Sequence, residues 1–274
     1  MFRSSRLACG LAMALFTTPL AAEETALLSL SGERAAFEYE AYKGGFRVMD
    51  IEIDLDLSDP GAYRMTLDGE LVGAPALLFT YEIAIAVQGR MSQSGPQPER
   101  YRIDSINGKK RKPEWLQLDF DARRVPQVSG EPLPKDEARP PVSEPRRRGA
   151  SDLLSSLLKV VQDVALTGGC ELEAAVFDGR RRFDVVSTDA GLRSLPKSSI
   201  NIFSGEARLC ELRVKPIAGY RFDGRDTKNL PQVIEAYMAA PAPDLPAVPV
   251  RMIVRTGWGP VLVHLVGFSG GGQG

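Results

Sequence analysis

The segment Phe37–Leu57 reads FEYEAYKGGFRVMDIEIDLDL and alternates apolar with polar residues on both sides of the pair Gly44-Gly45. Because successive side chains on a β-strand point to opposite faces, each half predicts a strand with one apolar and one solvated face. A glycine pair between two such runs is typical of a tight hairpin, in which both central residues adopt positive φ. The alternation changes phase near Met49-Asp50, which predicts a β-bulge that bends the second strand.

The same strand-and-turn pattern continues to the end of the chain. Alternating apolar residues predict further strands at 63–67, 79–87, 101–106, 116–121, 170–177, 180–187, 206–217, 233–239, 250–256 and 261–268. A run of leucines and valines at helical spacing differs from this pattern and predicts an α-helix over about 151–166, ended by Gly168-Gly169. We therefore expect a mostly β protein: an antiparallel, incompletely closed β-barrel with this one main α-helix packed on the sheet.

The first 22 residues have the form of a secretory signal peptide. Arg3 and Arg6 precede an apolar run over 7–16, and small residues lead to Ala22, after which we expect cleavage. No later stretch is long and apolar enough for a membrane-spanning helix, so the sequence predicts a periplasmic protein. We expect residues 23–268 to form one domain, with 126–145 as an exposed proline-rich loop rather than a domain boundary and 269–274 as a disordered tail.

Two cysteines remain in the mature chain, Cys170 and Cys210. Each shares its strand phase with apolar neighbours, so we expect both side chains on a buried face. In an oxidising compartment such a pair favours a disulfide; a metal site is the alternative, but it lacks nearby histidines to complete a tetrahedral ligand set. The formal net charge of -1 gives no general attraction to nucleic acid.

The order of these segments resembles an exported bacterial family known as domain of unknown function 3108. The resemblance spans nearly the whole mature chain and rests on Tyr39–Gly45, SDLLSSLL (Ser151–Leu158), Cys170 with VFDGRRRFDV (Val176–Val185), Cys210 with KPIAGY (Lys215–Tyr220), and VPVRMIVRTGWGPVLVHL (Val248–Leu265). The family looks like a distant relative of the Lol-type lipoprotein carriers. The resemblance implies a half-barrel whose concave apolar face is covered by helices, and it supplies no catalytic or ligand residues for this chain.

No group of residues in the sequence forms a recognisable catalytic site, so we expect neither enzyme activity nor a cofactor nor a bound metal. His264 is the single histidine and stands in an apolar predicted strand, where a structural role is more common than catalysis. The acids at 50, 52, 54 and 56 could supply the paired carboxylates of a glycoside hydrolase, although alternate acids on one strand are more simply a solvated outer face. A carboxylate-based hydrolase is therefore the least favoured of three candidate functions.

Large apolar side chains and a run of arginines give the candidate binding residues. An apolar ligand would contact Phe79, Tyr81, Trp115, Met252 and Trp258. The basic turn that contains Arg180, Arg181 and Arg182 would hold anionic headgroups, although exposed turns are often basic for solubility alone.

The sequence thus predicts a non-enzymatic protein of the cell envelope that binds a lipid or other amphipathic ligand in the concave face of the half-barrel. Its partner would be a lipid, a lipoprotein or an envelope polymer. The alternative is a structural module that binds another envelope protein through sheet edges or basic turns. Ligand binding requires an interior that side chains do not fill, and a solidly packed sheet fits the sequence about equally well.

Overall fold

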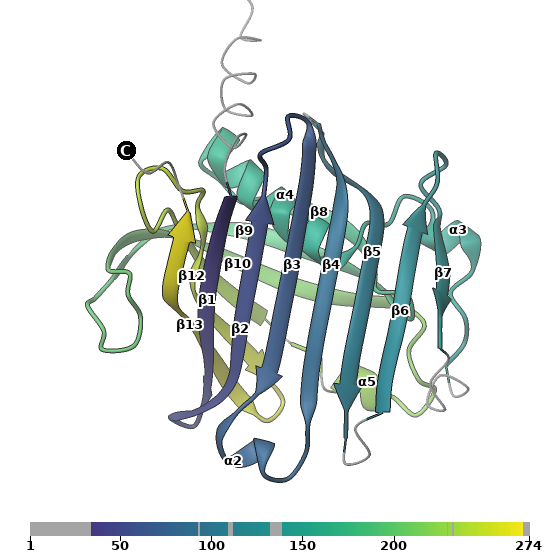
Figure 1. Cartoon of the computed structure of the whole chain (residues 1–274), viewed down its shortest axis with the longest axis horizontal. Helices are drawn as coiled ribbons and strands as arrows, with labels where there is room; N and C mark the ends of the chain where they lie inside the picture. Colours follow the sequence, from purple (N-terminus) through teal and green to yellow (C-terminus); the bar gives the residue numbers. More distant parts are fainter. Residues whose placement is uncertain are drawn as a thin grey trace, which may run out of the picture.

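The fold is one continuous antiparallel sheet that curls into an open barrel (Figure 1). The computed structural model describes residues 34–92, 94–108, 112–131, 139–228, 230–231 and 233–270. Within these ranges the sheet is 13-stranded, in the order β7-β6-β5-β4-β3-β2-β1-β13-β12-β11-β10-β9-β8. Because β7 and β8 are not paired with each other, the barrel has a seam, and the predicted antiparallel, incompletely closed barrel is confirmed.

The elements have the following bounds. The strands are β1 (Arg34–Lys43), β2 (Phe46–Asp56), β3 (Ala62–Leu71), β4 (Tyr81–Ser92), β5 (Gly95–Asn107), β6 (Lys112–Phe120), β7 (Pro126–Gly130), β8 (Leu172–Phe177), β9 (Arg182–Leu195), β10 (Gly205–Ala218), β11 (Val233–Ala239), β12 (Val248–Thr256) and β13 (Gly259–Gly270). The helices are α2 (Gly73–Ala76), α3 (Glu144–Arg147), α4 (Leu153–Thr167) and α5 (Arg225–Lys228).

The opening hairpin forms as the sequence predicts. Gly44 and Gly45 join β1 to β2 with φ of 59 and 84°, values that favour glycine. Ala41 pairs with Met49 and Tyr42 pairs with Arg47, so the residue between them on β2 is the extra residue of a β-bulge. The bulge lies one residue before the predicted position.

The connections between strands alternate between two ends of the barrel, because every neighbouring pair is antiparallel. The α2 end carries the connections β1–β2, β3–β4 (with α2), β5–β6, β8–β9, β10–β11 (with α5) and β12–β13. The opposite end carries β2–β3, β4–β5, β6–β7, β9–β10 and β11–β12. In Figure 1, α2 and α5 mark the lower part of the molecule.

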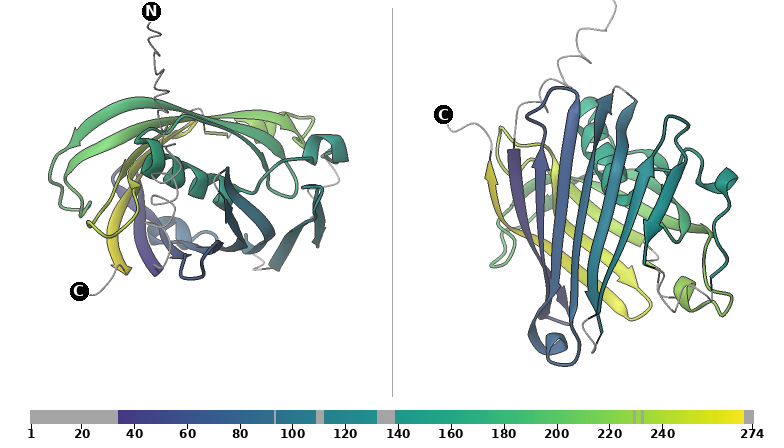
Figure 2. Two further views of the ribbon diagram at one scale, coloured as in Figure 1. Left: turned by 90° about the horizontal axis from the view of Figure 1, so that it is seen from above. Right: turned by 45° about the vertical axis from the view of Figure 1, so that its right-hand side comes forward.

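Helix α4 lies inside the curve of the sheet, as the view from above in Figure 2 shows. The Asp152 side chain caps its first turn by accepting a hydrogen bond from the Ser155 N–H at 2.9 Å, and Gly168 ends it with φ 69°. Leu154 and Leu158 are each 1% exposed and belong to the core that α4 shares with β2–β6. The predicted helix is therefore confirmed, with bounds two residues from the expected start and one from the expected end.

A disulfide fixes the C-terminal end of α4 to the sheet. The Cys170 and Cys210 sulfurs are 2.07 Å apart, and both residues are fully buried. Cys170 follows the helix after two glycines, and Cys210 lies on β10. The predicted pairing is confirmed.

Three sequence predictions on the chain's irregular parts need correction or fall outside the described ranges. Residues 126–130 are not loop but the edge strand β7; Pro126 stands at its first position and is buried, where a missing N–H removes no central ladder bond. Ser269 and Gly270 belong to β13 rather than to a tail, since they pair with β1. The predicted signal peptide and residues 271–274 lie outside the described part of the chain.

Candidate ligand-binding site

The inner face of the sheet, defined as the face that contacts α4, is not evenly buried. On β4, Ile85 and Val87 are 6% and 3% exposed beneath the helix, whereas Tyr81 and Ile83, nearer the α2 end, are only half-buried. On β2 the same change separates buried Leu55 from half-buried residues closer to the turn. The helix therefore covers only part of the inner face and leaves the part nearest the α2 end incompletely covered.

We call these half-buried apolar residues of the inner face the inner wall. They come from seven strands, and neighbouring members are in register. The inner wall consists of Met49, Ile51, Ile53, Leu67, Leu71, Tyr81, Ile83, Ile103, Ile234, Met252, Val254 and Val261. Apolar side chains that converge on a concave surface without full burial are typical of a site for an apolar ligand.

Gly69 shapes the centre of the inner wall. It pairs with Ile51 on one side and Ile83 on the other. A Cβ added at this position would lie 2.7 Å from the Met49 side chain and 3.2 Å from that of Ile83. The missing side chain therefore lets these two neighbours approach across β3.

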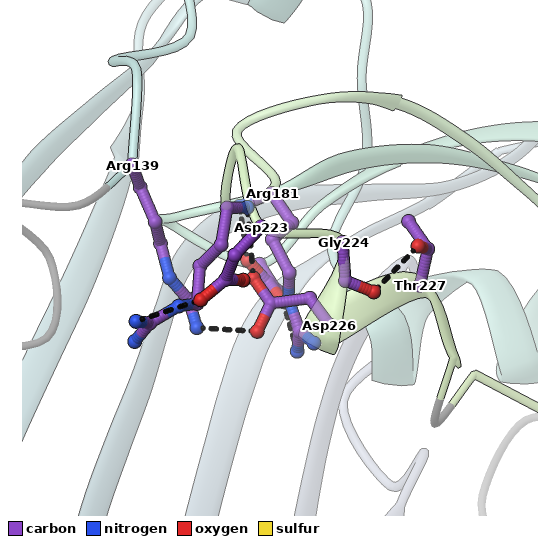
Figure 3. Close-up of polar contacts among 8 residues, drawn as sticks. Arg139, Arg181, Asp223, Gly224, Asp226 and Thr227 are labelled. Carbon is purple, nitrogen blue, oxygen red and sulfur yellow. Dashed lines mark hydrogen bonds and ion pairs between the residues drawn. The ribbon is translucent and has the colours of Figure 1, made fainter.

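Three arginine–aspartate pairs form a polar cluster beside the inner wall (Figure 3). Arg139 contacts Asp226 at 3.0 Å, Arg181 contacts Asp178 at 2.7 Å, and Arg221 contacts Asp223 at 3.3 Å. The Arg139–Asp226 pair joins the segment that follows β7 to the connection that carries α5. The other two pairs are local, one within the β8–β9 turn and one within the connection that carries α5. At this end the Arg139–Asp226 pair therefore ties two segments that are distant in sequence.

The polar cluster borders the inner wall at two tyrosines. Burial raises the pKa of Tyr220 to about 12, and burial also raises the pKa of Tyr81; Arg181 opposes both increases, so its charge lies close to both rings. The Tyr220 hydroxyl is buried without a hydrogen-bond partner. Buried hydroxyls without a partner are uncommon in folded proteins.

The structure distributes the five predicted apolar residues over three places. Tyr81 and Met252 belong to the inner wall. Phe79 is 48% exposed in the β3–β4 connection, and Trp258 is 75% exposed in the β12–β13 turn, both at the α2 end. Trp115 does not join them: it pairs with Asp104 on the outer face, where the Arg102 guanidinium lies 4.9 Å from its ring.

The predicted arginine run is divided in the same way. Arg181 belongs to the polar cluster, and Arg182 contacts Asp184 at 2.7 Å on β9. Arg180 lines a pocket of about 480 Å³ at the seam between β7 and β8, with apolar side chains that include Leu116 and Phe177. Sequence reasoning found the arginines but not the aspartate partners of Arg181 and Arg182, although these stand within three residues of them.

The outer face carries acids. A groove of about 740 Å³ on this face is lined by Glu38, Glu40, Asp50, Glu52, Asp68, Glu70, Glu82 and Asp104, among others. Arg47 pairs there with Glu40 at 2.8 Å and with Asp50 at 2.5 Å. This arrangement is that of a solvated face in which one arginine offsets part of the charge.

The other titratable candidates lie outside any cleft. Burial raises the pKa of Asp152 to about 6, but this carboxyl is fully buried and caps α4. His264 is 8% exposed on β13 in a T-shaped contact with the Tyr42 ring, and burial lowers its pKa. Over the described ranges, no three His, Cys, Asp or Glu residues are placed to hold a metal ion. Likewise, no helix in these ranges is long and apolar enough to cross a bilayer.

Comparison with known proteins gives a family and a fold. A family model described as "Protein of unknown function (DUF3108)" matches residues 38–266. The crystal structure of a β-barrel-like protein of domain of unknown function DUF1849 from Brucella abortus is similar, with a TM-score of 0.51, 10% sequence identity, and coverage of 88% of this chain and 98% of that chain. At this identity the likeness concerns the fold alone. No curated protein matches the chain.

Proposed function

The chain belongs to the DUF3108 family of proteins of unknown function, and from its geometry we propose that it is a non-enzymatic periplasmic protein that binds a lipid or other amphipathic ligand against the inner wall. The observation that supports this most is the change from buried to half-buried apolar residues toward the α2 end on the seven strands of the inner wall. Strand β1, which lies between β2 and β13, is the exception, because Tyr39 and Ala41 stay buried. A sheet that only supported α4 would have no reason to continue its apolar face beyond the helix.

In the proposed complex the alkyl part of the ligand covers Ile51, Ile83 and Met252, and its polar end lies toward Arg181 and Tyr220. Each methylene removed from water on this surface contributes about 0.8 kcal/mol. Arg181 already pairs with Asp178, which neutralises much of its charge. Its role in the complex is therefore to orient the polar end of the ligand rather than to bind it as a free cation.

Two further observations support the compartment and the absence of catalysis in this proposal. The Cys170–Cys210 disulfide is the bond expected of a protein that folds in an oxidising compartment. Asp152, the carboxyl whose pKa is raised by burial, is inaccessible to a substrate.

Two adjacent positions on β4 give a matched test. Ile83 faces the inner wall and Ala84 faces the outer groove, so Ile83→Asp and Ala84→Asp add the same charge to opposite faces. We expect a fluorescent fatty acid to bind the wild-type protein, to bind I83D about tenfold more weakly, and to bind A84D as it binds the wild type. Equal affinities for the two variants, or no binding by the wild type, would contradict the proposal.

The unpaired edge of β7 favours a second candidate function, that of a module that binds another envelope protein. Among the described strands β7 pairs only with β6, and an exposed edge can accept a strand from a partner. A photo-crosslinking residue at Val128, which is 43% exposed on β7, would test this in intact cells. One dominant protein adduct together with no fatty-acid binding would favour the module over the carrier.

A further inference from the structure

The most exposed large apolar side chains gather at one end of the barrel. Leu77 is 87% exposed, Phe222 86%, Trp258 75%, Phe46 74% and Leu78 66%; no other large apolar residue in the described ranges exceeds 53%. All five stand in or directly beside connections of the α2 end. We call these five residues the rim set.

The opposite end has no comparable group. Its exposed apolar residues in the β9–β10 region are Leu192 at 53%, Ile202 at 49% and Ile200 at 37%. Single exposed apolar residues need no explanation, because every protein surface has them. Five exposed apolar residues at one end, each more exposed than any at the other end, do require an explanation.

We propose that the α2 end docks on the surface of a lipid bilayer and that the rim set inserts into its interfacial region. The five residues come from four separate connections, β1–β2, β3–β4, β10–β11 and β12–β13, which Figure 1 shows spread along the lower part of the molecule. A stable protein partner requires about 800 Å² of continuous packed surface, which separated tips do not provide. A bilayer accepts each apolar side chain separately, and tryptophan and phenylalanine suit its interface.

The charged residues near the rim set bear on which lipids the α2 end can bind. Close to the rim set, Arg47 is paired with Glu40 and Asp50, and the neighbouring outer groove is lined with acids. Basic residues belong to the same end, at Lys43 beside the β1–β2 turn and in the sequence KKRK (109–112) that joins β5 to β6. The charges near the rim set therefore have both signs, whereas the rim set itself is apolar, and we expect docking on zwitterionic phosphatidylcholine vesicles, which carry no net lipid charge.

Docking on the bilayer is independent of the proposed ligand, because it does not require a ligand bound to the inner wall. In the docked orientation the incompletely covered end of the inner wall faces the lipid. Binding of a fatty acid in solution and binding to vesicles are separate measurements, so either can fail without the other.

The position of the two tryptophans allows a direct optical test. Trp115 lies on the outer face, so Trp115→Phe leaves Trp258 of the rim set as the only tryptophan in the sequence. We expect the emission of this variant to shift to shorter wavelength when phosphatidylcholine vesicles are added. An unchanged spectrum at saturating lipid would overturn the proposal.

A pair of double variants tests the location of the contact by vesicle flotation. Leu77→Glu with Phe222→Glu removes two members of the rim set, and Leu192→Glu with Ile202→Glu adds the same charges at the opposite end. We expect the first pair to lower the vesicle partition coefficient by about a hundredfold, about tenfold for each residue, and the second pair to leave it unchanged. Equal flotation of the two proteins would contradict docking through the α2 end, and matching circular dichroism spectra verify that both are folded.

Discussion

Removal of the Cys170–Cys210 disulfide should destabilise the protein by an amount that depends on the length of the loop that the bond closes. The bond closes a loop with a sequence separation of 40 and joins the end of α4 to β10. Closing a loop of that length removes about 13 cal/mol/K of conformational entropy from the unfolded chain. At 25 °C this contributes about 4 kcal/mol to the free energy of unfolding. We therefore expect Cys170→Ala with Cys210→Ala to lower that free energy by about 4 kcal/mol.

Urea unfolding followed by circular dichroism measures this loss. With an m-value of about 2.5 kcal/mol/M, the midpoint should fall by about 1.5 M, and the wild type in reductant should unfold at the midpoint of the variant. Reductant should leave the variant unchanged, which is the control. A difference below about 1 kcal/mol would refute the reasoning, because it would mean that the cross-link restricts the unfolded chain far less than a loop of this length should.

Three further substitutions test the contacts between α4 and the sheet. Burial raises the pKa of Asp152 from 3.8 to about 6, so the folded protein holds a proton that the unfolded chain releases, and this carboxyl lowers stability as pH rises through that window. The variant Asp152→Asn has no such carboxyl, so its free energy of unfolding in urea should increase by about 3 kcal/mol relative to that of the wild type between about pH 3 and pH 7. If the difference between the two free energies is the same at both pH values, the raised pKa of Asp152 is contradicted. Tyr63→Phe removes the 2.7 Å hydrogen bond to the Ser155 hydroxyl, and thermal unfolding should show a loss of about 1 kcal/mol, whereas no loss would mean that this bond is not formed. Leu158→Ala, at a site 1% exposed, should cost about 3 kcal/mol in the same measurement, and a loss below about 1 kcal/mol would argue against a buried α4.

Local patterns predicted the hairpins, the main helix and the disulfide because each of these depends on residues close in sequence or on strand phase. Gly44-Gly45 needs only the turn geometry of its own two residues, and Asp152 caps α4 from the adjacent position. Strand phase could also have placed Trp115 correctly. Leu116 and Leu118 alternate toward the core, so their neighbour at 115 had to face outward.

The extent of the inner wall could not be predicted, because it depends on how far α4 reaches along the barrel. That position is set by packing of Leu154 and Leu158 against residues from several distant strands, which no local pattern encodes. The polar cluster could not be predicted for a similar reason, because Arg139 and Asp226 are far apart in sequence and come together only in the folded protein. The edge strand β7 was missed because proline-rich segments rarely form strands, although a first-position proline on an edge is compatible with one.

Ligand contact with the inner wall can be measured by nuclear Overhauser effects between the alkyl protons of a fatty acid and the isoleucine methyl groups of the protein. Isoleucine occurs on both faces of the sheet: Ile51, Ile83 and Ile103 face inward, whereas Ile106 and Ile253 face outward. We predict contacts to the three inward methyl groups and none to the two outward ones. Contacts only to Ile106 or Ile253, or to no isoleucine at saturating ligand, would contradict a binding site inside the barrel.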